Sequence, residues 1–117
     1  MLLFKPEHVP MILDGTKNVT RRFWKKRRAV PGSLHQARTG LFGKPFAKLR
    51  ITEVYREKVT AITNEDIKNE GYGGRNEYLD VLMEINKGKF ETEWDFLQSP
   101  VWVVRFKVEE KQEANSE

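Results

Sequence analysis

Hydrophobic and polar residues alternate along several stretches of the chain with the two-residue period of β-strands. The apolar run 2–4 predicts a short buried strand at the start. In the longest stretch, 46–56, we expect Ala47, Leu49 and Ile51 to point towards the core. The same reasoning predicts further strands at 18–24, 34–39 and 101–108.

Three other segments show helical spacing. Residues 6–15 predict a short helix that begins near a proline and ends at Gly15. Thr63 and Asp66 have the spacing of a capping box, so a helix should run from there to about Glu70. The clearest helix precedes Gly88 and has apolar residues at i, i+3, i+4 and i+7, namely Tyr78, Val81, Leu82 and Ile85.

This pattern predicts an α+β fold, a small, mixed, partly closed β-barrel of about five to six strands with two to three helices. At 117 residues one hydrophobic core is enough, so residues 1–108 are expected to form a single domain. Residues 109–117 are polar and are expected to be a frayed tail.

Composition excludes several kinds of chemistry. The chain has no cysteine, which excludes disulfides, thiol catalysis and cysteine-based zinc sites. His8 and His35 lack metal-ligand spacing, so we expect no metal, and we expect no cofactor. No stretch approaches the ~20 apolar residues of a membrane span, and the expected location is the cytoplasm, without membrane contact.

Charge is divided unevenly along the chain. Residues 1–60 carry 14 Lys and Arg against 4 Asp and Glu, a net of +10, while residues 61–117 carry 7 against 13, a net of −6. Like charges concentrated in this way repel each other, which favours an anionic partner such as a nucleic acid. The alternative is that the two halves neutralise each other in the fold.

The segment 15–22 carries the candidate chemistry. Gly15 allows a sharp reversal that brings Lys17 to the mouth of the next strand, where Thr20 and Arg22 share one face. An ammonium, a hydroxyl and a guanidinium together suit a phosphate or a nucleobase edge. They could also form a nucleophile, Thr20, with a lysine base whose pKa is lowered by its surroundings. The alternative is an ordinary solvated edge strand.

The spacing Gly15-x-Lys17-x-x-Thr20-x-Arg22 resembles the signature of the ASCH family, a branch of the PUA-like superfamily. The resemblance covers most of the chain, through residues 4–15, 46–54, 62–72 and 100–104. It implies a PUA-like barrel whose helices pack around a cleft, and a link to RNA. Some bacterial relatives are amidohydrolases that deacylate N4-acetylcytidine with a lysine, a threonine and a glutamate. Here these residues would be Lys17, Thr20 and Glu70.

The chain differs from the family's compact amidohydrolases in the stretch 25–36, which is longer and more basic. This difference favours a polymer ligand over a free nucleoside. The leading hypothesis is therefore an RNA-binding monomer whose basic cleft accepts a nucleotide or modified base. An N4-acetylcytidine amidohydrolase is the alternative, and a ribonuclease ranks last. The predicted nucleic-acid contacts are Lys17, Arg21, Arg22, Trp24, Lys25, Lys26, Arg27, Arg28, Arg38 and Tyr72.

Aromatic residues divide between the core and this surface. Trp24 and Tyr72 are expected to be exposed, because an aromatic residue beside a basic groove can stack on a base. Trp102 and Phe106 belong to the last predicted strand and are expected in the core. For Trp94 the sequence favours neither place.

Overall fold

The structure, a computed structural model of the chain, describes residues 1–112. Within them, five strands form one sheet in the order β1-β3-β4-β5-β2. β1 pairs with β3 in parallel, and the other neighbours are antiparallel. The strands are β1 (Leu2–Leu3), β2 (Val19–Arg22), β3 (Leu34–Arg38), β4 (Ala47–Lys58) and β5 (Pro100–Lys111). The helices are η1 (Pro6–His8), α1 (Val9–Leu13), η2 (Val59–Ala61), α2 (Asn64–Asn69), α3 (Arg75–Ile85) and α4 (Glu93–Gln98).

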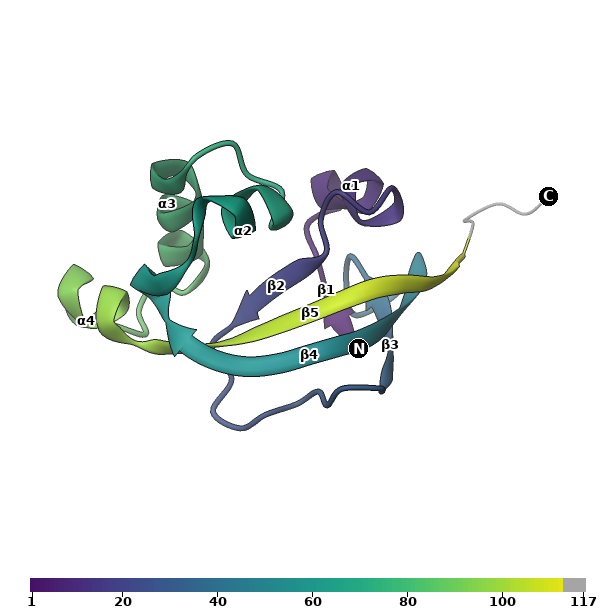
Figure 1. Cartoon of the computed structure of the whole chain (residues 1–117), viewed down its shortest axis with the longest axis horizontal. Coiled ribbons are helices and arrows are strands. Elements are labelled where there is room, and N and C mark those ends of the chain that lie inside the picture. The colour runs from purple at the N-terminus through teal and green to yellow at the C-terminus, as the bar shows by residue number, and fades with distance from the viewer. Residues whose placement is uncertain (113–117) are drawn as a thin grey trace.

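The long antiparallel pair β4–β5 is the axis of the molecule (Figure 1). Its register shifts at two irregularities, one at Glu109 of β5 and one at Thr52 of β4, and such bulges increase the bend and twist of a strand. The sheet curls into a half-barrel, so that its two edge strands approach each other. Nη2 of Arg22 on β2 donates a hydrogen bond of 2.7 Å to the carbonyl oxygen of Leu3 on β1.

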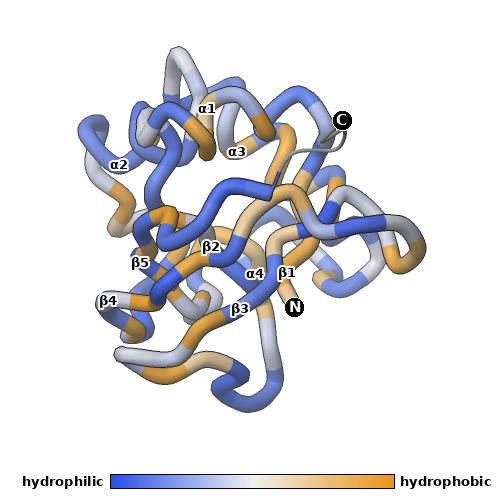
Figure 2. Tube along the Cα trace, turned by 90° about the vertical axis from the view of Figure 1, so that its right-hand side faces the viewer, coloured by the Kyte–Doolittle hydropathy of each residue, from blue (hydrophilic) through white to orange (hydrophobic). Residues whose placement is uncertain are grey.

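Two hydrophobic clusters occupy opposite parts of this sheet. The first packs α1, through Ile12, against apolar residues of β1, β3, β4 and β5. The second packs α2, α3 and α4, through Ile67, Leu82 and Phe96, against Val101. Helices α1, α2 and α3 lie on one side of the sheet in Figure 1, with α4 at one end. Figure 2 shows hydrophobic stretches of the strands in the middle of the molecule and a largely hydrophilic α2.

The predicted α+β fold, with five strands and helices between them, is confirmed. Thr63 caps α2 as expected, because its hydroxyl accepts a hydrogen bond of 3.1 Å from the backbone N–H of Asp66. The helix α4 was not predicted. It is only six residues long and begins with a second cap, from Thr92 to the N–H of Asp95.

Two other expectations are corrected. β5 continues to Lys111, so Glu110 and Lys111 are paired with β4 rather than frayed, and the rest of the predicted tail, 113–117, lies outside the described residues. Trp102 is only partly buried, with Arg56 over its ring at 5.0 Å, whereas Phe106 is in the core. Ile85, the last residue of the apolar spacing that predicted α3, is 59 % exposed. No helix in residues 1–112 has the length and apolar character needed to cross a bilayer.

Candidate functional site

A cavity of about 530 Å³ lies where the two hydrophobic clusters meet, between the edge strands β1 and β2 and the helices α2 and α3. This volume is within the range of pockets that bind small molecules, roughly 300–1,000 Å³. One wall is apolar and comes from α3, with Val81, Leu82 and Ile85. The polar residues of the lining are Lys5, His8, Lys17, Thr20, Arg21, Arg22, Thr39, Glu70, Tyr72, Tyr78, Asn86 and Lys89.

Lys17 reaches this cavity because the chain reverses after α1. Gly15 adopts a φ of 87°, a conformation that favours glycine, and the N–H of Lys17 then bonds to the carbonyl of Met11. The Lys17 side chain is only 3 % exposed. Its Nζ donates to the carbonyl oxygen of Glu70 at 2.5 Å and to Oε1 of Glu70 at 3.3 Å. Burial lowers the pKa of Lys17, and the charge of Glu70 opposes this effect.

Glu70 points inward, which the sequence alone left open. It caps the C-terminus of α2 and is 3 % exposed. Gly71 follows with a φ of 98°, and a Cβ there would lie 3.0 Å from Cε of Met11 and 3.7 Å from Cδ of Lys17. Only glycine therefore lets the chain turn so close to Lys17. The other carboxylate oxygen, Oε2, accepts from Nη1 of Arg21 at 3.0 Å and from the hydroxyl of Tyr78 at 3.3 Å.

Thr20 and Arg22 form the adjoining part of the wall, as their positions on one strand face predict. Thr20 is buried, and its hydroxyl oxygen accepts a hydrogen bond of 3.0 Å from Nε of Arg22. The guanidinium of Arg22 also lies over the ring of Phe4, at 5.1 Å from its centroid. Lys17, Thr20 and Glu70 thus converge on one cavity.

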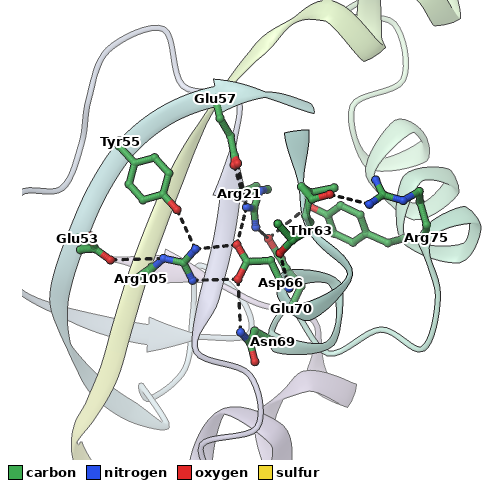
Figure 3. A network of polar contacts seen from close by, with 12 residues as sticks. Arg21, Glu53, Tyr55, Glu57, Thr63, Asp66, Asn69, Glu70, Arg75 and Arg105 are labelled. Atoms are coloured by element: carbon green, nitrogen blue, oxygen red, sulfur yellow. Dashed lines mark hydrogen bonds and ion pairs between the residues drawn. The ribbon is translucent and has the colours of Figure 1, made fainter. Parts of the chain in front are cut away.

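Arg21 is the centre of a buried ionic network (Figure 3). Its guanidinium bonds to Glu70, to Asp66 at 2.9 Å and to Glu57 at 3.3 Å. Arg105 binds the same Asp66 carboxylate at 3.0 and 2.7 Å. Burial alone would raise the pKa of Asp66, but the hydrogen bonds from Arg105 and then Arg21 outweigh it and lower this pKa to about 2.

This network corrects the surface role expected for Arg21. Its side chain is 1 % exposed, and three carboxylates surround its guanidinium. Such a group does not reach the phosphates of a polymer. The sequence around Arg21 gave no sign that this side chain is buried, because its carboxylate partners come from a distant part of the chain.

His8 and Tyr78 are site residues that the sequence did not indicate. The rings of His8 and Tyr72 are in edge-to-face contact at 5.3 Å, and those of Tyr72 and Tyr78 at 5.2 Å. Burial, and then the charge of Lys17, lower the pKa of His8 to about 4, so the imidazole is neutral at pH 7. Burial raises the pKa of Tyr72 to about 12. Tyr72 was expected to be exposed, but it is partly buried in the cavity wall.

The other predicted contacts lie outside the cavity or at its edge. Residues 25–28 are exposed in the connection from β2 to β3, which runs along the lower side of the sheet in Figure 1. No ion pair involves them within residues 1–112. Trp24, immediately before them, is partly buried and lines the cavity. Arg38 does not line it, and its guanidinium bonds to Gln36 and to the carbonyl of Gly43.

No group of three or more His, Cys, Asp or Glu side chains in the described part of the chain is arranged to hold a metal ion. The polar groups of the cavity are five cations, a carboxylate, two threonine hydroxyls, an imidazole, two phenols and the amide of Asn86. They can bind an anion or a polar ring, and they bring a hydroxyl nucleophile near a buried amine.

Comparison with known proteins finds solved structures that share the fold of this chain. No family model matches the chain. No curated protein matches it either. The ASCH domain from Lactobacillus crispatus JV V101 superposes with a TM-score of 0.71 at 18 % identity, covering 87 % of this chain and 70 % of that one.

Two further solved structures are similar. Protein EF3133 from Enterococcus faecalis V583, of the family DUF984, gives a TM-score of 0.69 at 15 % identity, covering 95 % of this chain and 75 % of that one. The hypothetical protein PH0355 gives 0.67 at 16 %, covering 92 % and 95 %. At these identities the likeness establishes the fold alone, so the chain has the fold seen in the ASCH domain structure, a curled half-barrel sheet with helices around a cleft.

Proposed function

We propose that the chain is a nucleic-acid-binding domain, for RNA, which holds phosphates on the loop 25–28 and accepts one splayed-out nucleotide in the cavity. The observation that carries this proposal is the position of Trp24. It lines the cavity and is directly followed by four exposed cations, Lys25, Lys26, Arg27 and Arg28.

The two parts suit the two parts of a single-stranded nucleic acid. Exposed cations without carboxylate partners gain most from an anionic backbone, because binding releases the counterions of the phosphates. An unstacked base gains from an aromatic wall, by roughly 1–3 kcal/mol for each stacked base. Trp24 and Tyr72 provide such rings beside the cations of the cavity. The likeness to an ASCH domain is compatible with this proposal.

The test is binding of single-stranded RNA as a function of salt. Replacing Lys25, Lys26, Arg27 and Arg28 with Ala should lower the affinity for RNA sharply. The slope of log K against log salt concentration should decrease in magnitude by up to about 3. The matched control removes four exposed lysines elsewhere, Lys44, Lys68, Lys87 and Lys107, and so gives the same change of net charge. Equal losses in both variants, or none in the first, would contradict the assignment of the loop.

A second candidate function, hydrolysis of an N4-acylated cytidine, is favoured by the convergence of Lys17, Thr20 and Glu70 on the cavity. Thr20 would attack the acyl carbon while its proton passes to the neutral amine of Lys17. The C–N bond would break as this proton moves to the departing amine, with Glu70 in contact with Lys17 throughout. Water would then release the acyl group from Thr20 as a carboxylic acid by the same proton route.

Burial supports this chemistry because it lowers the pKa of Lys17 and so increases the fraction of neutral amine. The test is incubation with N4-acetylcytidine and chromatographic detection of cytidine. Release that is lost in both Lys17→Ala and Thr20→Ala, in variants that still fold, would establish the mechanism. Release that survives both substitutions would exclude it, and no release from the unaltered protein would leave RNA binding as the function.

A further inference from the structure

We propose that the cavity is built for a nucleotide rather than an uncharged nucleoside, and that Arg22, with Lys5 and Lys89, binds its phosphate. This inference rests on the proposed function and specifies the ligand of the same site. It uses two lysines, Lys5 and Lys89, that the sequence motif does not include.

The first argument is a surplus of positively charged donors. Lys17 has three N–H donors, and two of them go to Glu70. Nε and Nη2 of Arg22 bond to Thr20 and Leu3, whereas Nη1 makes no hydrogen bond within residues 1–112 and is not sealed from solvent. A partly buried guanidinium on a cavity wall with an unused edge is suited to an anion that enters the cavity.

The second argument is the lack of a charged acceptor to satisfy these donors. Glu70 is the one carboxylate of the described lining, and both of its oxygens are occupied, Oε1 by Lys17 and Oε2 by Arg21 and Tyr78. Arg22 has no carboxylate within ion-pair distance in the described residues. Burial lowers the pKa of Arg22, and the charge of Glu70 opposes this only in part, which is the unfavourable situation of a buried cation without a carboxylate in contact with it.

The third argument is the presence of two further cations in the lining of the cavity. Lys5 lies between β1 and η1 and directly follows Phe4, whose ring the guanidinium of Arg22 contacts, and Lys89 follows α3; both line the cavity. Neither takes part in an ion pair among residues 1–112. Two lysines and a guanidinium that line one cavity provide the point charges and the planar fork that bind a phosphate. Trp24 and Tyr72 can receive the base.

The experiment is calorimetric titration with cytidine, cytidine 5′-monophosphate, cytidine 3′-monophosphate and inorganic phosphate. We expect at least one monophosphate to bind about ten- to a hundred-fold more tightly than cytidine, since charge-assisted hydrogen bonds contribute at this level. The double variant Lys5→Ala, Lys89→Ala should lose most of this advantage and bind cytidine as before. Lys87→Ala is the matched control, because Lys87 is exposed, lies two residues from Lys89 and does not line the cavity.

The outcomes separate this inference from the proposed function. Equal binding of cytidine and its monophosphates would overturn the phosphate site, while the RNA proposal would still depend on the loop variants. Inorganic phosphate that binds as tightly as the nucleotides would overturn a nucleotide ligand in favour of the free ion. If the monophosphates bind more tightly than cytidine but the loop variant binds RNA as well as the unaltered protein, the phosphate site is supported and the proposed RNA surface is contradicted.

Discussion

Among single residues, His8 shows how burial in the cavity wall changes the pKa of a lining side chain. His8 is buried beside Tyr72 and near Lys17, so a proton on its ring would lose hydration and meet another positive charge. The pKa of His8 accordingly falls from 6.5 to about 4. In the unfolded chain the imidazole regains its ordinary pKa, so between these two values only the unfolded state binds this proton.

We therefore predict that His8 makes the fold less stable in mild acid. As pH falls from about 6.5 to about 4, the free energy of unfolding should drop by about 1–3 kcal/mol through this group. His8→Gln should remove most of that slope, and urea unfolding at pH 7, 5.5 and 4.5 measures it. His35, whose pKa burial also lowers, contributes with the same sign and remains in both proteins. A variant with an unchanged slope would show that His8 is protonated in the folded state.

The residue scale also shows what the sequence could predict about the site. The spacing of Lys17, Thr20 and Arg22 depends only on a turn at Gly15 and the alternation of one strand, and both are local properties. The burial of Arg21 depends on Asp66 and Glu70, more than forty residues away. No local pattern encodes that contact, so a buried arginine and a surface arginine looked the same.

At the scale of elements, the short helix α2 connects the site to the rest of the fold. It carries Asp66 near its start and is capped at its end by Glu70. The carbonyl of Asn69 also accepts a hydrogen bond of 3.0 Å from the N–H of Asn18, next to Lys17. With only six residues, α2 has little stability of its own and depends on its cap and on packing.

We predict that Thr63→Ala lowers the free energy of unfolding by about 1 kcal/mol, the usual effect of losing a helix N-cap. It should also speed hydrogen exchange at the amides of Asn18 and Glu70, because these depend on α2. Thr92→Ala is the matched control, since Thr92 caps α4 in the same way and α4 carries no residue of the cavity lining. Equal exchange at Asn18 in both variants would contradict a link between the cap and the site.

The helices and strands that the sequence predicted best are long and have their apolar residues on one face. β4 alternates regularly and α3 has a clear period, so both were found with nearly correct bounds. α4 has the same kind of cap as α2 but buries mainly Phe96, and six residues give too little periodicity to reveal a helix. The end of β5 was missed because Glu109 and Lys111 are polar, and its pairing with β4 holds these residues in the sheet.

At the scale of the whole molecule, the uneven charge of the two halves has two different outcomes. Six of the eight ion pairs within residues 1–112 join residues 1–60 to residues 61–112, and the buried ones lie around Arg21 and Lys17. To that extent the halves neutralise each other. The loop 25–28 has no such partner, so its four positive charges remain an uncompensated cost in the free chain.

This difference predicts that the exposed cations of the loop 25–28 lower the stability of the free chain at low salt. Replacing Lys25, Lys26, Arg27 and Arg28 with Ala should leave the protein at least as stable at low salt, and more stable by roughly 0.5–1 kcal/mol if their mutual repulsion is felt. The gain should vanish in 1 M salt, where the screening length falls to about 3 Å from about 30 Å at 0.01 M. Urea unfolding at the two salt concentrations measures it. A variant that is less stable at low salt would mean that the loop is held by carboxylates of the protein itself, and the case for an anionic partner at this surface would fail.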